Sequence, residues 1–201
     1  MKKSFILFLL FSLFILNACQ TSTQIQWNPI SKVQTDKGSD VCLQNKFKDR
    51  RNEGTETQVG TNTWTLVAIP IAPIYANSEV NKKVRDALEE AMEGADIRVE
   101  VTDSVKSCNR TITGQIQEFW FTSYNWFWPF CKEKGSIEVE LMLLNQTSNR
   151  IWQKKYFAKV SKFTFGGAYG YGGMIKKAMN KILKDIQQDL NSNQFKTLIQ
   201  S

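Results

Sequence analysis

The sequence predicts an α+β fold in which a mixed or antiparallel sheet of about four to five strands carries two helices packed on one face. Several segments alternate apolar and polar residues with the period of a half-buried strand. Two further segments, 78–94 and 174–190, repeat apolar residues at helical spacing. No internal repeat is visible, and 201 residues suffice for one domain with shorter segments beside it.

Residues 1–18 have the organisation of an export signal. Lys2 and Lys3 precede an apolar stretch from Phe5 to Leu16. As a helix this stretch would measure about 18 Å, well short of the roughly 30 Å hydrocarbon core of a membrane. We therefore expect a signal peptide rather than a membrane span.

The signal ends in Leu16-Asn17-Ala18-Cys19, where a small residue precedes a cysteine. This pattern resembles the lipobox of bacterial lipoproteins. The resemblance implies cleavage before Cys19 and covalent attachment of diacylglycerol and a fatty acyl chain such as palmitate. Two alternatives stay open, an ordinary cleaved signal beside an unrelated cysteine and a short uncleaved anchor. Gln20 stands where Asp commonly marks inner-membrane retention, so we expect the periplasmic face of the outer membrane.

Residues 19–40 are polar and aperiodic, which predicts a flexible tether to a single periplasmic domain at 41–201. A strand is expected at 41–48 and a polar loop at 49–62. The apolar segment 64–75 contains Pro70 and Pro73, which restrict it to a short edge strand or an extended loop. Ser78 is the expected N-cap of the first helix, and Gly94 is its expected end.

The second half of the chain alternates strands and turns before its last helix. Strands are expected at 97–101 and 110–121, followed by a hairpin of 137–144 and 151–160 across the turn 145–149. The glycine-rich connector 166–173 then leads into the C-terminal amphipathic helix. These glycines fit neither the phosphate-loop nor the dinucleotide-binding pattern, so we expect a connector rather than a nucleotide site.

The charge and composition of the chain argue against several classes of function. The net charge of +7 falls to about +5 once Lys2 and Lys3 are removed, and the basic residues are scattered, so we expect no nucleic-acid binding. The chain has no histidine, which excludes His-based catalytic triads and His metal ligands. The paired acids Glu89 and Glu90 fall on an expected helix surface, where solvation explains them. We therefore expect no catalytic site, no metal and no cofactor beyond the lipid.

Three cysteines remain besides Cys19, namely Cys42, Cys108 and Cys131. In an oxidising compartment they allow one disulfide. If the strands beginning near Cys42 and Cys108 run parallel, both cysteines lie at the same edge of the sheet. Cys131 would follow the far end of the second strand, roughly 40 Å away. We predict the pair Cys42–Cys108 with Cys131 unpaired; the alternative is three buried thiols.

The segment 119–130 is the strongest candidate for a binding surface, because eight of its twelve residues are aromatic. Trp and Tyr favour places where one end of the side chain is apolar and the other is hydrated. Together with 64–75 the segment is expected to form an exposed patch that contacts a partner protein or the membrane. The alternative is that alternate rings fill the core of the sheet. The predicted contact residues are Trp64, Tyr75, Trp120, Tyr124, Trp126, Phe127, Trp128 and Phe130.

Short motifs in this order of elements resemble the YajG-type lipoproteins. The resemblance extends to a wider group with the N-terminal domain of TolB, CsgG-like proteins and auxiliary lipoproteins of envelope transporters. It covers about 41–190 and implies a periplasmic α/β domain that binds partners and catalyses nothing. The motifs are Phe47-x-Asp49-x-Arg51, Val59-Gly60 and Gly114-x-Ile116-x-Glu118-Phe119.

The anchor and the resemblance lead to one function and one alternative. We expect a non-catalytic binding or scaffold component of an envelope assembly, held to the membrane by lipid, with an envelope protein as partner. The alternative is a carrier or auxiliary subunit that binds a lipid or another apolar ligand. A flat exposed aromatic patch would favour the scaffold, and a closed pocket between helix and sheet would favour the carrier.

Overall fold

The computed structural model describes residues 21–31, 39–64, 69–104, 108–127, 130–165 and 171–200. Within them the fold is α+β, as predicted, with a mixed sheet of nine strands and three helices instead of four to five strands and two helices. The helices are α2 (Val80–Gly94), α3 (Tyr171–Leu190) and α4 (Asn193–Gln200). The strands are β1 (Thr21–Thr23), β2 (Ser39–Gln44), β3 (Lys48–Asp49), β4 (Gln58–Trp64), β5 (Ile69–Ala76), β6 (Ile97–Thr102), β7 (Arg110–Phe127), β8 (Phe130–Asn145) and β9 (Arg150–Phe165).

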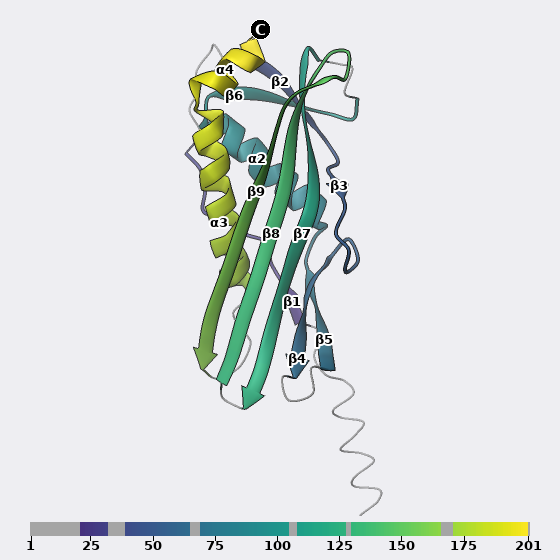
Figure 1. Cartoon of the computed structure of the whole chain (residues 1–201), viewed down its shortest axis with the longest axis vertical. Coiled ribbons are helices and arrows are strands. Elements are labelled where there is room, and N and C mark those ends of the chain that lie inside the picture. Colours follow the sequence, from purple (N-terminus) through teal and green to yellow (C-terminus); the bar gives the residue numbers. More distant parts are fainter. Residues whose placement is uncertain are drawn as a thin grey trace, which may run out of the picture.

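The three longest strands, β7, β8 and β9, form an antiparallel meander that runs the length of the molecule (Figure 1). One edge of β7 pairs in turn with β2, β3 and β4, all of them parallel to it. Gly60 on β4 is required there, because a Cβ atom would lie 1.8 Å from the carbonyl oxygen of Phe121. Beyond β4 follow β5, which is antiparallel to it, and β1, which is parallel to β5.

The core lies between the inner face of the sheet and helices α2 and α3 (Figure 1). The apolar face predicted for the C-terminal helix is buried in α3, because apolar residues recur along it every three or four positions. In β8 the odd-numbered residues from Cys131 to Leu143 are buried, as the two-residue period of a strand requires. Buried α3 residues are Tyr171, Met174, Ile175, Ala178, Met179, Ile182, Leu183, Ile186 and Leu190.

Several predicted boundaries were wrong. The expected loop 49–62 contains the start of β4, and β7 continues to Phe127 instead of ending at residue 121. Residue 79, not Ser78, is the N-cap of α2, and it makes no capping hydrogen bond through its side chain. Of the expected edge segment 64–75, residues 69–75 form part of strand β5. The prolines are tolerated on the side facing β1, because β1 pairs with β5 only at 74–76, beyond both of them.

The predicted flexible tether is wrong for residues 21–31. Thr21 to Thr23 form an edge strand, and Ile25 is buried in the core. The carboxylate of Glu90 accepts a hydrogen bond from the Trp27 indole at 2.6 Å and another from the backbone N–H of Ile30 at 2.7 Å. These contacts fix the segment to α2, a role that the polar composition of 19–40 does not suggest.

The β7–β9 meander has two ends with different surroundings, the base and the tip. The base is the end with the β8–β9 turn at 145–149, together with α4, β2 and β6 (Figure 1). The tip is the opposite end and comprises the described residues 124–127, 130–134 and 161–165. Cys19 and the rest of the predicted signal lie outside the described residues. Among the helices that the structure describes, none has the length and hydropathy needed to cross a membrane.

Candidate functional site

The outer face of the tip exposes aromatic rings that alternate with lysines. Phe130, Phe163 and Phe165 have exposed fractions of 61%, 76% and 77%. The rings of Phe130 and Phe165 meet edge to face with centroids 5.4 Å apart. The Lys132 ammonium lies 5.0 Å from the centroid of the Phe163 ring, and the Lys134 ammonium lies 5.4 Å from that of Tyr124. Such contacts combine an apolar surface with positive charge.

The predicted contact residues are only partly placed on this surface. Phe130 is exposed, whereas Trp120, Tyr124 and Tyr75 are half-buried. The backbones of Trp64, Trp126 and Phe127 belong to β4 and β7, but their side chains lie outside the described part, as does all of Trp128.

The residues of the aromatic segment divide between the two faces of the sheet. Phe119 and Phe121 are buried and fill the core, while the alternate positions turn to the outer face. Phe163 and Phe165 were missed because they lie on β9, beyond the expected strand 151–160. The alternation of inward- and outward-facing residues along β9 could have identified them. Because Ala158 and Val160 are buried, the odd-numbered residues of the same strand are expected to point outward.

A cluster of polar side chains lies on the inner side, where the tip meets α3. The Cys131 thiol is 2.7 Å from the Ser123 hydroxyl, and both residues are buried. Tyr171, the first residue of α3, donates a hydrogen bond to the Asn62 side chain on β4. Burial raises the pKa of Tyr171, a hydrogen bond with Ser123 opposes that rise, and the charge of Glu133 adds to it. Tyr171 therefore stays neutral and joins α3 to the sheet.

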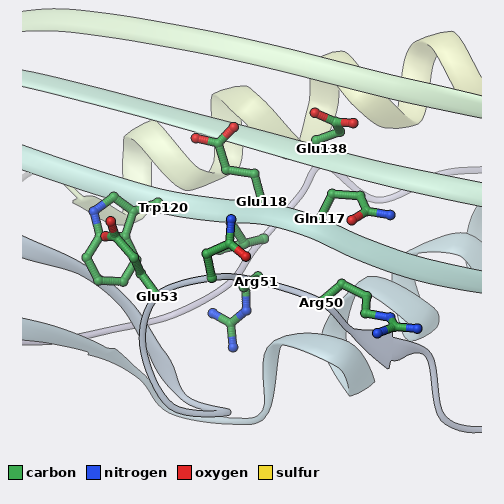
Figure 2. A pocket seen from close by; sticks show the side chains of 9 residues that line it. Arg50, Arg51, Glu53, Gln117, Glu118, Trp120 and Glu138 are labelled. Carbon is green, nitrogen blue, oxygen red and sulfur yellow. The ribbon is translucent and has the colours of Figure 1, made fainter.

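A groove of about 410 Å³ lies on the outer face between β7 and the loop that follows β3. Figure 2 shows Glu118 and Glu138 on the sheet side, with Arg50 and Arg51 on the loop side. Ser136 donates a hydrogen bond to Glu118, and Lys155 pairs with Glu138 at 3.5 Å. The lining residues are Arg50, Arg51, Asn52, Glu53, Gln117, Glu118, Phe119, Trp120 and Glu138.

Arg51 shapes the loop side of this groove. Its guanidinium bonds the Asp49 carboxylate at 2.7 Å and also donates to the backbone carbonyls of Thr55 and Gln58. Burial raises the pKa of Asp49, but the hydrogen bonds and charge of Arg51 outweigh burial and hold that pKa below its ordinary value. The motif Asp49-x-Arg51 thus forms a fixed loop, and the groove offers polar and charged groups beside Trp120.

The structure joins Cys42 and Cys108 in a disulfide with Cα atoms 6.0 Å apart, the pair that the sequence predicts. β2 and β7 run parallel, which is the arrangement on which that prediction depends. Cys131 is a buried free thiol. Glu100 lies beside the disulfide, but bonded sulfurs do not supply thiolate ligands.

The region between helix and sheet, where the carrier alternative places a ligand, is occupied by protein. Ile175, Met179 and Ile182 of α3 are buried against Ile137 and Val139 of β8 in one continuous core cluster. Among the described residues, the aromatic surface at the tip and the open polar groove are both accessible to solvent.

No protein-family model matches the chain, and no curated protein matches its sequence. Among solved structures, XCC0632 from Xanthomonas campestris, of family DUF330, is 9% identical, covers 90% of this chain and 96% of its own, and has a TM-score of 0.53. An uncharacterized protein is 10% identical over 89% of this chain and 98% of its own, with a TM-score of 0.45. Lipoprotein GNA1162 from Neisseria meningitidis is 8% identical over 76% of this chain and 99% of its own, with a TM-score of 0.38. The similarity to XCC0632 shows a shared fold.

Proposed function

We propose that this protein is a non-catalytic scaffold component of an envelope assembly, anchored through lipid on Cys19 to the periplasmic face of the outer membrane. The YajG-type and transporter-auxiliary lipoproteins are the families that the motifs resemble. One observation carries the proposal: the chain enters the folded domain at Thr21, only two residues after Cys19. An anchor joined so closely to the sheet holds the domain in a restricted orientation.

The contacts of residues 21–31 support this rigid connection. In addition to the two hydrogen bonds to Glu90, the backbone N–H of Asn28 donates to the Asn180 side chain of α3 at 2.7 Å. Gly94 allows the close approach of the segment, because a Cβ atom there would lie 2.4 Å from Ile30. The segment therefore bonds to both α2 and α3, so residues 21–31 are part of the folded domain and not a flexible tether.

The groove is the proposed contact for a protein partner. Trp and Arg are enriched among the residues that dominate binding energy in interfaces, and the groove supplies Trp120 near one end and Arg50 near the other (Figure 2). Carboxylates at Glu53, Glu118 and Glu138 surround them, so the complementary surface would carry both apolar and basic groups. The open shape and paired charges fit recognition of a folded surface.

Site-specific photo-crosslinking in intact cells tests the partner. A benzophenone amino acid at Gln117, which lines the groove, is expected to give a defined adduct with one envelope protein. The matched control is the same amino acid at Lys181, an exposed position of α3. The proposal is contradicted if Gln117 yields no adduct, or if both positions capture the same set of proteins.

The anchor has its own test. Cys19→Ser is expected to leave the precursor unprocessed or to release the protein, whereas the wild type partitions into detergent and floats with the outer membrane. Detergent partitioning of a mature Cys19→Ser protein would exclude lipidation, and flotation of the wild type with the inner membrane would exclude the proposed location.

A further inference from the structure

We infer that the tip is a membrane-docking surface that inserts its exposed phenylalanines among phospholipids of the membrane that holds the anchor. The inference rests on the proposed lipidation of Cys19. It goes beyond that anchor, because it assigns a second lipid contact to the folded domain itself. Phe130, Phe163 and Phe165 supply the apolar contact, and neighbouring lysines face the phosphates.

The register of the sheet fixes how far the tip lies from the start of the domain. Thr21 pairs with Ile74, Ile74 with Gly60, and Gly60 with Phe121. The same row continues through Gly135 of β8 to Val160 of β9. The last row of the tip joins Phe130 and Phe165, five residues further along both strands.

This spacing is greater than the reach of the anchor. Five strand residues measure about 17 Å. The two residues that separate Cys19 from Thr21 span at most about 7 Å when fully extended. Even a chain stretched straight toward the tip therefore leaves the backbone of Cys19 about 10 Å short of the last row, by the same residue lengths.

The chemistry of the lipid then places the tip in the membrane interface. In a diacylglyceryl thioether the cysteine sulfur occupies the position of the phosphate in a phospholipid, so the backbone of Cys19 lies at the level of the headgroups. If the domain stands upright, the tip extends about 10 Å deeper into the membrane than the backbone of Cys19. If the domain tilts, its tip lies along the membrane surface. In both orientations the tip contacts lipid. Apolar faces of interfacial proteins are buried to a depth of about 5–10 Å.

The side chains of the tip are of the kinds that favour a membrane interface. Of the six large apolar residues that are exposed in the described part of the chain, five lie toward the tip, and Phe157 is the exception. Charged residues of the described tip that reach solvent are Lys132, Lys134 and Lys162, while the acidic Glu133 is 1% exposed. Aromatic rings flanked by lysines match an interface in which the lipid phosphates are negative.

Fluorescence quenching by lipid tests the docking. The lipidated protein carrying Ser161→Cys is labelled with the fluorophore NBD and reconstituted into vesicles of phosphatidylethanolamine and phosphatidylglycerol. Ser161 is exposed at the tip, and the free thiol of Cys131 is buried, so labelling is selective. Phospholipid brominated high on the acyl chain is expected to quench this label severalfold more than a label at Thr147→Cys, which lies in the exposed turn at the base.

Matched variants assign the effect to the tip. Phe163→Ser with Phe165→Ser is expected to remove more than half of the quenching at residue 161. Phe157→Ser, which changes an exposed ring on the same face of β9 closer to the base, should preserve the quenching. Lys132→Gln with Lys134→Gln should reduce the quenching on these vesicles but not on uncharged phosphatidylcholine.

The outcomes separate this inference from the proposed function. A protein that fails to float with the vesicles contradicts the anchor at Cys19. A protein that floats while its label at residue 161 is quenched no more than the label at residue 147 overturns the docking alone. The inference is also overturned if a photo-crosslinker at Ser161 captures one defined protein in intact cells, because that result would assign the tip to a protein partner.

Discussion

The base and the tip of the β7–β9 meander use the same kinds of side chain in opposite ways. At the base, Phe195 of α4 is 1% exposed and packs edge to face on Trp152, with centroids 5.1 Å apart. At the tip, Phe163 is 76% exposed and contacts the Lys132 ammonium. Helices cover the sheet at the base, whereas the outer face of the tip is open. Aromatic residues therefore stabilise the fold at one end and are available for recognition at the other.

The largest effect should come from truncating one ring at each end. Phe195→Ala is expected to lower the free energy of unfolding by about 3–5 kcal/mol, because it leaves a cavity in packed surroundings. Phe163→Ala should change it by less than about 0.5 kcal/mol, since the ring is largely solvated. Chemical denaturation of both variants measures the difference. Equal losses would show that the two ends are packed alike.

The disulfide should strengthen the base by a smaller amount. Replacing both Cys42 and Cys108 with Ser opens a loop of 66 residues and is expected to cost about 2–4 kcal/mol. Non-reducing peptide mapping of periplasmic material checks the bond itself, and thermal unfolding of the double variant checks its contribution. A peptide that links Cys131 to either other cysteine would contradict the pairing.

A third change tests how firmly the segment that follows the anchor is held. Glu90→Ala removes the acceptor for Trp27 and Ile30 and should cost about 1.5–3 kcal/mol, the range for hydrogen bonds to a charged group. Hydrogen exchange of residues 24–31 should accelerate. The neighbouring Glu89→Ala is the control, because that carboxylate lies 3.7 Å from Arg85 and is not an acceptor for the segment. Equal exchange in both variants would show that Glu90 does not hold it.

The smallest expected effect concerns the ion pair between Asp49 and Arg51. A carboxyl group whose pKa is lower in the folded than in the unfolded state stabilises the fold above its unfolded pKa, and that contribution is lost as pH falls through the folded pKa. Asp49→Asn should therefore cost up to about 1 kcal/mol at neutral pH, given its partial exposure. The difference from the wild type should vanish in strong acid. Urea unfolding at several pH values measures this difference in the free energy of unfolding. A difference that stays constant with pH would contradict a stabilising ion pair between Asp49 and Arg51.

Local patterns predict the regular part of this fold well. Apolar residues at helical spacing locate α2 and α3, and alternation locates the central parts of β7, β8 and β9, because both signals arise within a single element. The parallel pairing of β2 and β7 can also be predicted from the sequence, since it follows from a crossover connection between the strands. The same reasoning identifies Cys42 and Cys108 as partners.

The missed features depend on contacts between distant segments. α2 ends at Gly94, as predicted, but the sequence does not indicate that Gly94 is also where Ile30 approaches the helix. The same contact explains why a polar stretch such as 21–31 is ordered. The sequence of α2 predicts a solvated Glu90, because nothing within the helix indicates that this carboxylate accepts hydrogen bonds from residues some 60 positions earlier.

The unpaired side of β9 affects how neighbouring copies behave. Among the described strands β9 pairs only with β8, so it presents a long free edge that another strand could extend. If the protein is anchored as proposed, its copies diffuse in two dimensions, where such edges collide often. Lysine is the residue that natural sheets use most to prevent edge-to-edge association. β9 carries four lysines that are expected to oppose such pairing: Lys154, Lys155, Lys159 and Lys162.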